Sequence, residues 1–297
     1  MFSDTHFHFK MMVTERGIDG VEVLSKMADR DCFLGLDIGT KPEDLLDRQA
    51  FLDKTIDQIA DGQISDRVRD FIYFSAGIWP EVEYIHNREE SVNQLIAQIQ
   101  RAAAEPDRDT LHRKIIAIGE CGLDHHWNPS GADGRSEEDF DSKTYQGERE
   151  LFEMQLELAK KLCLPVIVHS RDAFTDTLEC IQNIGYDNGI IHCFSYGLDE
   201  AKAFLERGWF ISFGGGVTYT KRSHIEQMRE LLRYVPSDRI LIETDAPYLS
   251  PVPLRGCPNT PLNIEHTYKY VADMRDVSVE ELSKTVDENI DRLFLLR

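Results

Sequence analysis

The amino-acid sequence predicts an α/β fold, a (β/α)8 TIM barrel that occupies residues 1–297 as a single domain. Short apolar runs alternate with helical patterns along the whole chain, and this alternation favours a parallel sheet. The apolar runs number eight, and 297 residues accommodate a barrel of roughly 250 residues with insertions. Apolar residues make up 41% of the chain, which is enough to bury a core.

Eight apolar runs are expected to form the strands. Residues 115–118 (Ile-Ile-Ala-Ile) are typical, because strands that helices bury on both faces are nearly continuous in apolar residues. In chain order the predicted strands are Met1–Phe7, Cys32–Asp37, Phe71–Gly77, Ile115–Glu120, Pro165–His169, Gly189–His192, Trp209–Phe213 and Ile240–Asp245. Eight such strands favour a closed barrel over an open sheet.

Helices are predicted between the strands, where apolar residues recur at steps of three and four. Two segments show this periodicity clearly, residues 146–162 and residues 279–293. Ser278, with Glu281 three residues later, forms a capping-box pattern at the start of the second segment. The recurring residues are Leu151, Met154, Leu158 and Leu162 in the first segment, and Val279, Leu282, Val286, Ile290 and Leu293 in the second.

Two polar segments are predicted to be loops, Asn128–Thr144, which is acidic, and Ser250–Pro261, which carries four prolines. Both follow predicted strands, so both are expected at the C-terminal rim of the barrel, where the active sites of such barrels lie.

The formal net charge of −20 argues against a broad basic face that grips duplex DNA. It does not exclude an enzyme that takes one end of a nucleic acid into a pocket, because metals and arginines there would offset the phosphate charge. The six cysteines are scattered without a C-x-x-C pair and are expected to be reduced thiols. With no long apolar stretch and no signal-peptide pattern, we expect a cytoplasmic protein that makes no membrane contact.

Six metal-ligating side chains lie where predicted strands end. His6 and His8 are two residues apart, a spacing that places both on one face of a strand. The other four are Glu120, His169, His192 and Asp245, at the ends of the fourth, fifth, sixth and eighth predicted strands. Strand ends converge on one rim of a barrel, so these side chains are expected around a common centre.

Four imidazoles and two carboxylates suit divalent cations, with Mg²⁺, Mn²⁺ and Zn²⁺ all open as the identity. An open catalytic zinc usually takes three protein ligands and a water, so six ligands indicate two ions that share a carboxylate. Two ions about 3.5–4 Å apart can activate a water and stabilise the leaving oxygen of an in-line displacement.

Further residues are expected near this centre. Arg171 follows His169 by two and could hold a phosphate with its planar fork, or else pair with Asp172. Glu243 precedes Asp245 by two and is expected to orient a ligating histidine. His126, like its neighbour His125, could line the pocket.

Six motifs in order resemble the TatD family of metal-dependent deoxyribonucleases. They are DTHFH at 4–8, GECGLD at 119–124, PVIVHSRDA at 165–173, IHCFSYG at 191–197, FISFGGGVTY at 210–219 and ETDAPYL at 243–249. The resemblance covers nearly the whole chain and implies an amidohydrolase-like barrel. It implies one metal on His6, His8, Glu120 and Asp245, and a second on Glu120, His169 and His192, with Glu120 bridging.

One turn departs from the family pattern. After the third strand the family usually has Gly-x-His-Pro-His, whereas this chain has Trp79 and Glu81 in place of the two histidines. Trp79 could stack against a base, a contact worth roughly 1–3 kcal/mol, or could simply pack beneath a loop. The Glu81 carboxylate would repel a phosphate. The departure leaves the metal ligands intact and bears on the substrate.

The leading hypothesis is a hydrolase that cleaves phosphodiester bonds of single-stranded DNA from the 3′ end, as the resemblance implies. Asp245 would act as the general base and Glu120 as the bridging ligand, with two divalent cations per subunit. Arg171, Trp79, Glu81 and His126 would contact the substrate, and the protein is expected to be a monomer without an obligate protein partner. The alternatives are a hydrolase of an ester, lactone or amide, including the ester of an aminoacyl-tRNA, and a non-catalytic metal-binding scaffold.

Overall fold

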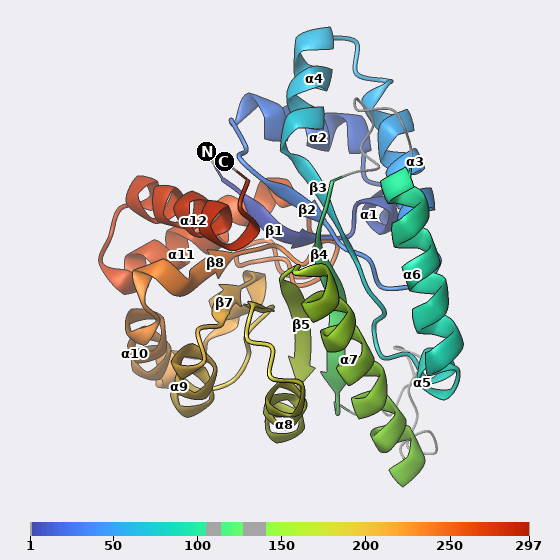
Figure 1. The fold of residues 1–297 in the computed structure, drawn as a ribbon. Helices are drawn as coiled ribbons and strands as arrows, with labels where there is room; N and C mark the ends of the chain where they lie inside the picture. The colour runs from blue at the N-terminus through green and yellow to red at the C-terminus, as the bar shows by residue number, and fades with distance from the viewer. Residues whose placement is uncertain (1, 105–113, 127–140, 297) are drawn as a thin grey trace.

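Eight parallel strands form one barrel, in the order β1 to β8. The computed structural model describes residues 2–104, 114–126 and 141–296, and each of these strands pairs in parallel with the next one along the chain. Helices surround the strands on the outside (Figure 1). The first strand meets the segment that follows the last one, through a parallel bridge between Phe7 and Ala246 and a hydrogen bond of 2.8 Å from His8 N to Ala246 O. The predicted TIM barrel is therefore confirmed.

All eight predicted strands are present, with altered ends. Their bounds are β1 Asp4–Phe7, β2 Gly35–Asp37, β3 Ile72–Ala76, β4 Ile115–Asp124, β5 Val166–Arg171, β6 Gly189–Ile191, β7 Phe210–Phe213 and β8 Ile240–Ile242. Most strands are shorter than predicted: β1 and β2 each begin three residues later, and β8 ends at Ile242 instead of Asp245. Two strands are longer at their C-terminal ends, where β4 continues four residues past Glu120 and β5 continues two past His169. The extra residues pair with each other, since Asp124 lies opposite Arg171, so the two strands extend together above the barrel.

Twelve α-helices are found in the described residues. They are α1 Phe9–Arg16, α2 Gly20–Asp29, α3 Leu45–Ile56, α4 Gly62–Phe71, α5 Val82–His86, α6 Arg88–Ala104, α7 Ser142–Leu162, α8 Phe174–Ile184, α9 Leu198–Glu206, α10 Ile225–Tyr234, α11 Ile264–Arg275 and α12 Val279–Phe294. Four short 3-10 helices lie in the second half, η3 Gly215–Tyr219, η4 Arg222–His224, η5 Ser237–Arg239 and η6 Pro261–Asn263. In the described part of the chain, no helix is long and apolar enough to span a membrane.

The two helices predicted from periodicity are α7 and α12. The side-chain oxygen of Ser278 accepts the Glu281 N–H at 3.0 Å, which is the predicted cap of α12. Helix α7 begins with a cap from Asp141, which accepts the Thr144 N–H at 2.8 Å. The predicted loop Asn128–Thr144 lies outside the described residues up to position 140, and its last three residues belong to α7.

Strand side chains and the inner faces of the helices form the core. Leu36, Phe74, Ile118, Val168 and Ile211 in the strands are at most 1% exposed. Such burial on both faces of a strand explains the continuous apolar runs in the sequence. At the C-terminal end of the barrel this pattern breaks, because polar side chains that are also buried replace the apolar ones.

Candidate metal centre

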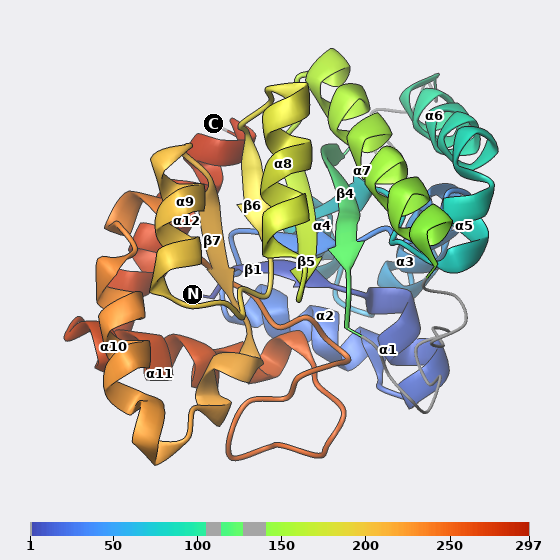
Figure 2. The same cartoon turned by 90° about the horizontal axis from the view of Figure 1, so that it is seen from below.

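Five of the six predicted ligands line one cavity of ≈ 730 Å³ at the C-terminal end of the barrel, and His6 lies beneath them. The cavity is lined by His8, Glu120, His169, His192 and Asp245, together with Asp124, Arg171, Trp79, Glu81, Cys193 and Tyr248, among others. Figure 2 shows the loops that follow the strands at this end of the barrel. The structure thus brings together side chains as far apart in the sequence as His6 and Asp245.

Glu120 lies at the centre of the cluster and its two carboxylate oxygens face different histidines. Oε2 lies 3.4 Å from His6 Nε2 and 3.8 Å from His8 Nε2. Oε1 lies 2.9 Å from His169 Nδ1 and 3.0 Å from His192 Nε2. One carboxylate therefore faces two separate pairs of imidazoles.

Asp245 contacts the same two imidazoles, His6 and His8, that Glu120 Oε2 faces. We call His6, His8, Glu120 and Asp245 the first group, and Glu120, His169 and His192 the second group. Asp245 Oδ1 lies 3.7 Å from His6 Nε2 and 3.5 Å from His8 Nε2. The backbone holds this position, because Asp245 N donates to His6 O at 2.8 Å and the residue adopts φ 55°, a left-handed conformation that Asp tolerates. The side chain is 14% exposed, so it also reaches the open cavity.

The spacing in this first group fits a shared cation better than it fits hydrogen bonds. Two ligands about 2.1 Å from one metal at tetrahedral angles are separated by about 3.4 Å, close to the distances from His6 to Glu120 and Asp245. Both ring nitrogens of His6 are buried without a hydrogen-bond partner among the described residues. Buried polar atoms are rarely left without a partner, so a bound cation accounts for the arrangement. Burial, together with His192, lowers the pKa of His6 and keeps the ring neutral.

In the second group each imidazole lies between two carboxylates. His169 has Glu120 at Nδ1 and Asp124 Oδ2 3.0 Å from Nε2. His192 has Glu120 at Nε2 and Glu243 Oε1 3.3 Å from Nδ1. A neutral imidazole offers only one N–H, so it cannot donate to both carboxylates. Either a second proton or a cation near Glu120 must offset the negative charge, and a divalent cation there would leave the outer N–H to Asp124 or Glu243.

The pKa values describe the same electrostatic balance. Burial alone would raise the pKa of Glu120, but His192, His169 and His6 hold it well below its ordinary value. Burial alone would lower the pKa of His192, but Glu120 and Glu243 raise it well above its ordinary value. Positive charge is thus stabilised in the space between these residues, which is a property of a cation site.

Glu120 owes its position to glycines on both sides. A Cβ at Gly122 would lie 1.9 Å from His169 O, and the residue adopts φ 149°. A Cβ at Gly119, at φ 132°, would lie 2.5 Å from Ile167 O. Only glycine fits such close approach with positive φ, so the G-E-C-G sequence lets β4 run directly against β5. Glu120 N also donates to Gly39 O at 2.8 Å.

Glu243 lies behind the cluster, as expected from its place two residues before Asp245. Its Oε1 accepts the Cys193 N–H at 2.6 Å and lies 3.3 Å from His192 Nδ1. Its Oε2 is buried and has no partner in the described structure. The carboxylate therefore fixes the ring of His192 and the backbone beside it.

Three of the four predicted substrate contacts line the cavity. Arg171 is 46% exposed, and its Nη1 lies 3.9 Å from Asp124 Oδ2 rather than beside Asp172. Trp79 meets the ring of His169 edge-on, with centroids 5.7 Å apart. Glu81 lies beside Trp79, and burial raises its pKa.

His126 is the exception among the predicted substrate contacts. Its Nδ1 lies 2.7 Å from Asp172 Oδ2, and it does not line the cavity. Its neighbour His125 instead lies 3.2 Å from Glu148, a residue of α7. Because β4 extends to Asp124, His125 and His126 lie beyond the metal ligands and do not belong to the proposed site.

Asp124 was missed by the sequence interpretation. It is buried at the end of β4, contacts His169 and accepts the His126 N–H at 2.9 Å. In a strand, residues 120, 122 and 124 face the same side, so the signal was present in the G-E-C-G-L-D sequence. It was overlooked because the predicted strand ended at Glu120.

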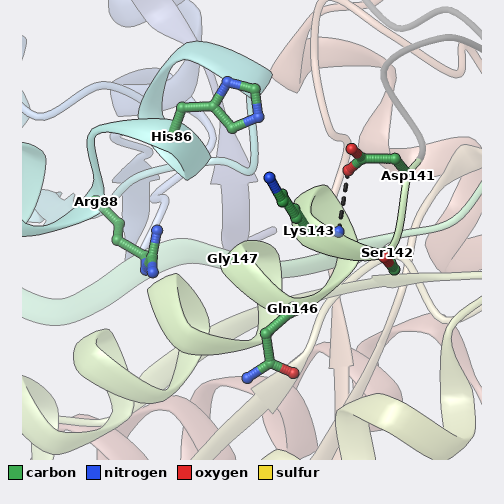
Figure 3. Close-up of a pocket in the computed structure, with 7 residues that line it drawn as sticks. All are labelled: His86, Arg88, Asp141, Ser142, Lys143, Gln146 and Gly147. Carbon is green, nitrogen blue, oxygen red and sulfur yellow. Dashed lines mark hydrogen bonds between the residues drawn. The ribbon is translucent and has the colours of Figure 1, made fainter.

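A second cavity, of ≈ 650 Å³, lies between α5, α6 and the start of α7, away from the barrel centre (Figure 3). His86, Arg88 and Lys143 point toward it, but His86 lies against Thr144 and Arg88 pairs with Glu150. None of the groups of metal-ligating side chains in the described residues includes a residue of this cavity. The chemistry therefore belongs to the cavity at the strand ends.

A TIM barrel that gathers four imidazoles and two carboxylates at its C-terminal rim has the architecture of a metal-dependent hydrolase. The chain also matches the family model described as TatD related DNase over residues 3–295. It therefore belongs to the TatD family, and it is a metal-dependent hydrolase of that family.

Individual relatives agree with this assignment. The chain is 34% identical to the uncharacterized metal-dependent hydrolase YabD of Bacillus subtilis, over 76% of this chain and 78% of the relative. It is 33% identical to the 3'-5' ssDNA/RNA exonuclease TatD of Pantoea vagans, over 76% and 79%. The crystal structure of the TatD homolog YJJV from Escherichia coli superposes with a TM-score of 0.74 at 25% identity, covering 99% of this chain and 98% of that one.

Proposed function

We propose that this protein hydrolyses phosphodiester bonds of single-stranded DNA from the 3′ end, with two divalent cations per subunit. The observation that carries the proposal is the position of Glu120, whose two oxygens face two separate pairs of imidazoles. Two cation positions that share a carboxylate suit in-line displacement at phosphorus. The family description and the name of the relative from Pantoea vagans support DNA as the substrate.

The residues divide into two ligand sets. His6, His8, Glu120 and Asp245 would hold one cation, and Glu120, His169 and His192 the other. Bound divalent cations at such a site supply charge that polarises a water molecule and the scissile phosphodiester. Mg²⁺, Mn²⁺ and Zn²⁺ are all compatible with these ligands.

Protein side chains would perform the remaining steps. Asp245 reaches the cavity and would accept a proton from the attacking water as general base. Arg171 also lines the cavity, at the end of β5, and its guanidinium would bind the phosphoryl oxygens. Asp124 and Glu243 would hold the rings of His169 and His192 in place.

The test is a cleavage assay with metal-stripped protein and single-stranded DNA labelled at the 5′ end. Mg²⁺, Mn²⁺ and Zn²⁺ are returned separately, and Glu120→Ala is the control. We expect a ladder of shortened products that depends on metal and is absent with the variant. Equal activity of the Glu120→Ala protein would reject the mechanism.

A second candidate function is hydrolysis of an ester or amide, including the ester of an aminoacyl-tRNA. The presence of Glu81 in the cavity wall favours it, because a carboxylate there repels a phosphate. A panel of ester and amide substrates should then show turnover that depends on metal and is lost in Glu120→Ala. Absence of such turnover beside active DNA cleavage would exclude this candidate.

A further inference from the structure

Two segments, one that includes β7 and the residues after it and one that follows β8, contain no acidic residue. No Asp or Glu occurs in residues 207–225 or in residues 246–264, although the chain holds 53 acidic and 33 basic residues. The same segments carry Lys221, Arg222 and Arg255 at exposed positions. In a chain with a net charge of −20, two acid-free segments with several cations are a strong local departure.

The two segments are joined in space. Val252 N donates to Thr218 Oγ1 at 2.9 Å, and Tyr219 Oη donates to Ser250 O at 2.6 Å. The guanidinium of Arg255 lies 4.5 Å from the centre of the Tyr219 ring. Residues 214–224 and 246–257 therefore form one continuous surface, which we call the cationic surface.

This surface begins at the wall of the metal site. Gly216, Val217, Tyr248 and Leu249 belong to it and also line the cavity. Figure 2 shows the loop between β8 and α11 extending from the end of the barrel toward which the arrows of β4 and β5 point. A nucleic-acid strand with one end at the metal site could therefore continue directly onto the cationic surface.

Within residues 2–104, 114–126 and 141–296, the three cations of the surface have no carboxylate partner. No carboxylate among the described residues forms an ion pair with Lys221, Arg222 or Arg255, and the contact of Arg255 is to the ring of Tyr219. Most other arginines of the described structure pair with carboxylates, as Arg207 does with Asp187 at 2.7 Å. Unpaired cations on a neighbouring pair of loops provide sites for phosphates.

The opposite side of the cavity has the reverse charge. Glu81 lines the cavity there, after β3, and Glu83, Glu43 and Lys41 lie close enough to act on its carboxyl group. The cationic surface, in contrast, follows β7 and β8. The cations of this surface and Glu81 are therefore carried by different strands of the barrel.

The cationic surface also exposes apolar side chains. The described residues include six exposed large hydrophobic side chains, and three of them, Tyr248, Leu249 and Val252, lie here with exposures of 42%, 38% and 49%. Single-stranded nucleic acid presents both phosphates and base faces, and grooves that bind it combine cations with such side chains. An acidic peptide would need only the cations. The combination of cations with exposed apolar side chains therefore favours a single-stranded nucleic acid as the ligand.

We propose that the cationic surface binds the part of a nucleic-acid strand that remains outside the metal site, with Lys221, Arg222 and Arg255 contacting its phosphates. The inference rests on the proposed function, since it takes the strand to enter the cavity by one end. It assigns the long loop Ser250–Pro261 a role in holding substrate.

The test measures binding of a 5′-fluorescein-labelled oligo(dT) of about twelve nucleotides with phosphorothioate linkages, which resist cleavage, in the presence of Mg²⁺. The variant is K221A/R222A/R255A. The matched control, K54A/R101A/K161A, removes the same number of exposed cations from α3, α6 and α7 on the outside of the barrel. Anisotropy is recorded between about 50 and 200 mM salt.

We expect the affinity of the first variant to fall at least about tenfold at the lowest salt, and the slope of log K against log salt to decrease by about 2, since each phosphate contact on a single strand contributes about 0.7. The control should retain the wild-type slope. Equal slopes in both variants, or no binding by the wild type, would overturn the proposal. The binding assay needs no cleavage, so it tests the cationic surface separately from the proposed function. If the three cations contribute to binding but an ordinary single-stranded DNA is not cleaved in the assay described above, only the proposed function is rejected.

Discussion

Asp124 Oδ2 lies 3.0 Å from His169 Nε2, while the other nitrogen of that ring lies 2.9 Å from Glu120 Oε1. The ring is thus fixed from behind by a buried carboxylate that is itself held at the end of β4. This contact sets which nitrogen of His169 points toward the centre. The same arrangement recurs for His192, with Glu243 in the place of Asp124.

Replacing Asp124 with Asn should lower metal affinity about 10–100-fold, because the carboxylate that orients His169 loses its charge. Metal competition with a chelating dye measures the affinity. Asp172→Asn is the control, since Asp172 contacts His126 outside the cavity. Unchanged affinity in Asp124→Asn would show that the contact does not support a metal ligand.

Glu120→Gln should reduce the number of bound metal ions and lower activity by more than about 100-fold. A ligand shared by two metal ions should contribute more than a side chain that only orients a ligand. Loss of such an orienting side chain lowers metal affinity or activity about 10–100-fold. The amide keeps the shape of the side chain, so thermal unfolding should still be cooperative. Elemental analysis of the purified proteins gives the metal content, and a variant with a full complement of two ions would contradict the shared-carboxylate arrangement.

Removing metal should lower the thermal stability of the wild type. A ligand that binds only the folded state at about 100 times its Kd contributes about 2.7 kcal/mol. Calorimetry with and without a chelator measures the change in Tm. In Glu120→Gln the chelator should have a smaller effect, and an equal effect in both proteins would place the stabilising metal elsewhere.

Arg171→Ala should lower kcat/KM on a phosphodiester by about ten- to one-hundredfold, as expected for loss of a charge-assisted hydrogen bond of about 1.5–3 kcal/mol. Arg171→Lys should recover only part of this, because lysine keeps the charge but not the planar fork. Steady-state kinetics measures both, with Arg207→Ala, far from the site in an ion pair with Asp187, as the control. Full activity of Arg171→Ala would remove this residue from the site.

Trp79→Ala should weaken binding of a nucleic-acid substrate by about 1–3 kcal/mol if the indole stacks with a base. Trp79→Phe should retain much of the binding, because a ring remains. Because Trp79 also meets the ring of His169, metal affinity must be measured in the same variants. A loss of metal affinity without a change in substrate KM would assign Trp79 to packing.

Much of this architecture was accessible from the sequence. Continuous apolar runs located all eight strands, and the position of His6, His8, His192 and Asp245 beside strand ends indicated a common centre. The extent of β4 was not accessible, because Cys121, Gly122 and Leu123 look like a turn when read alone. Their strand conformation depends on pairing with β5, which approaches closely enough to require the glycines.

The sequence by itself determined the barrel class, the family and the residue types of the candidate metal centre, because hydrophobic periodicity and motif order are local properties of the chain. Tertiary structure decided which side chains meet. Asp4, for example, joins β1 to the segment after β8 by accepting the Thr244 N–H at 3.0 Å, across nearly the whole chain. The support of His169 by Asp124 and the union of two loops into a cationic surface are likewise contacts between distant segments. Such contacts arise only when the barrel closes, so no local pattern specifies them.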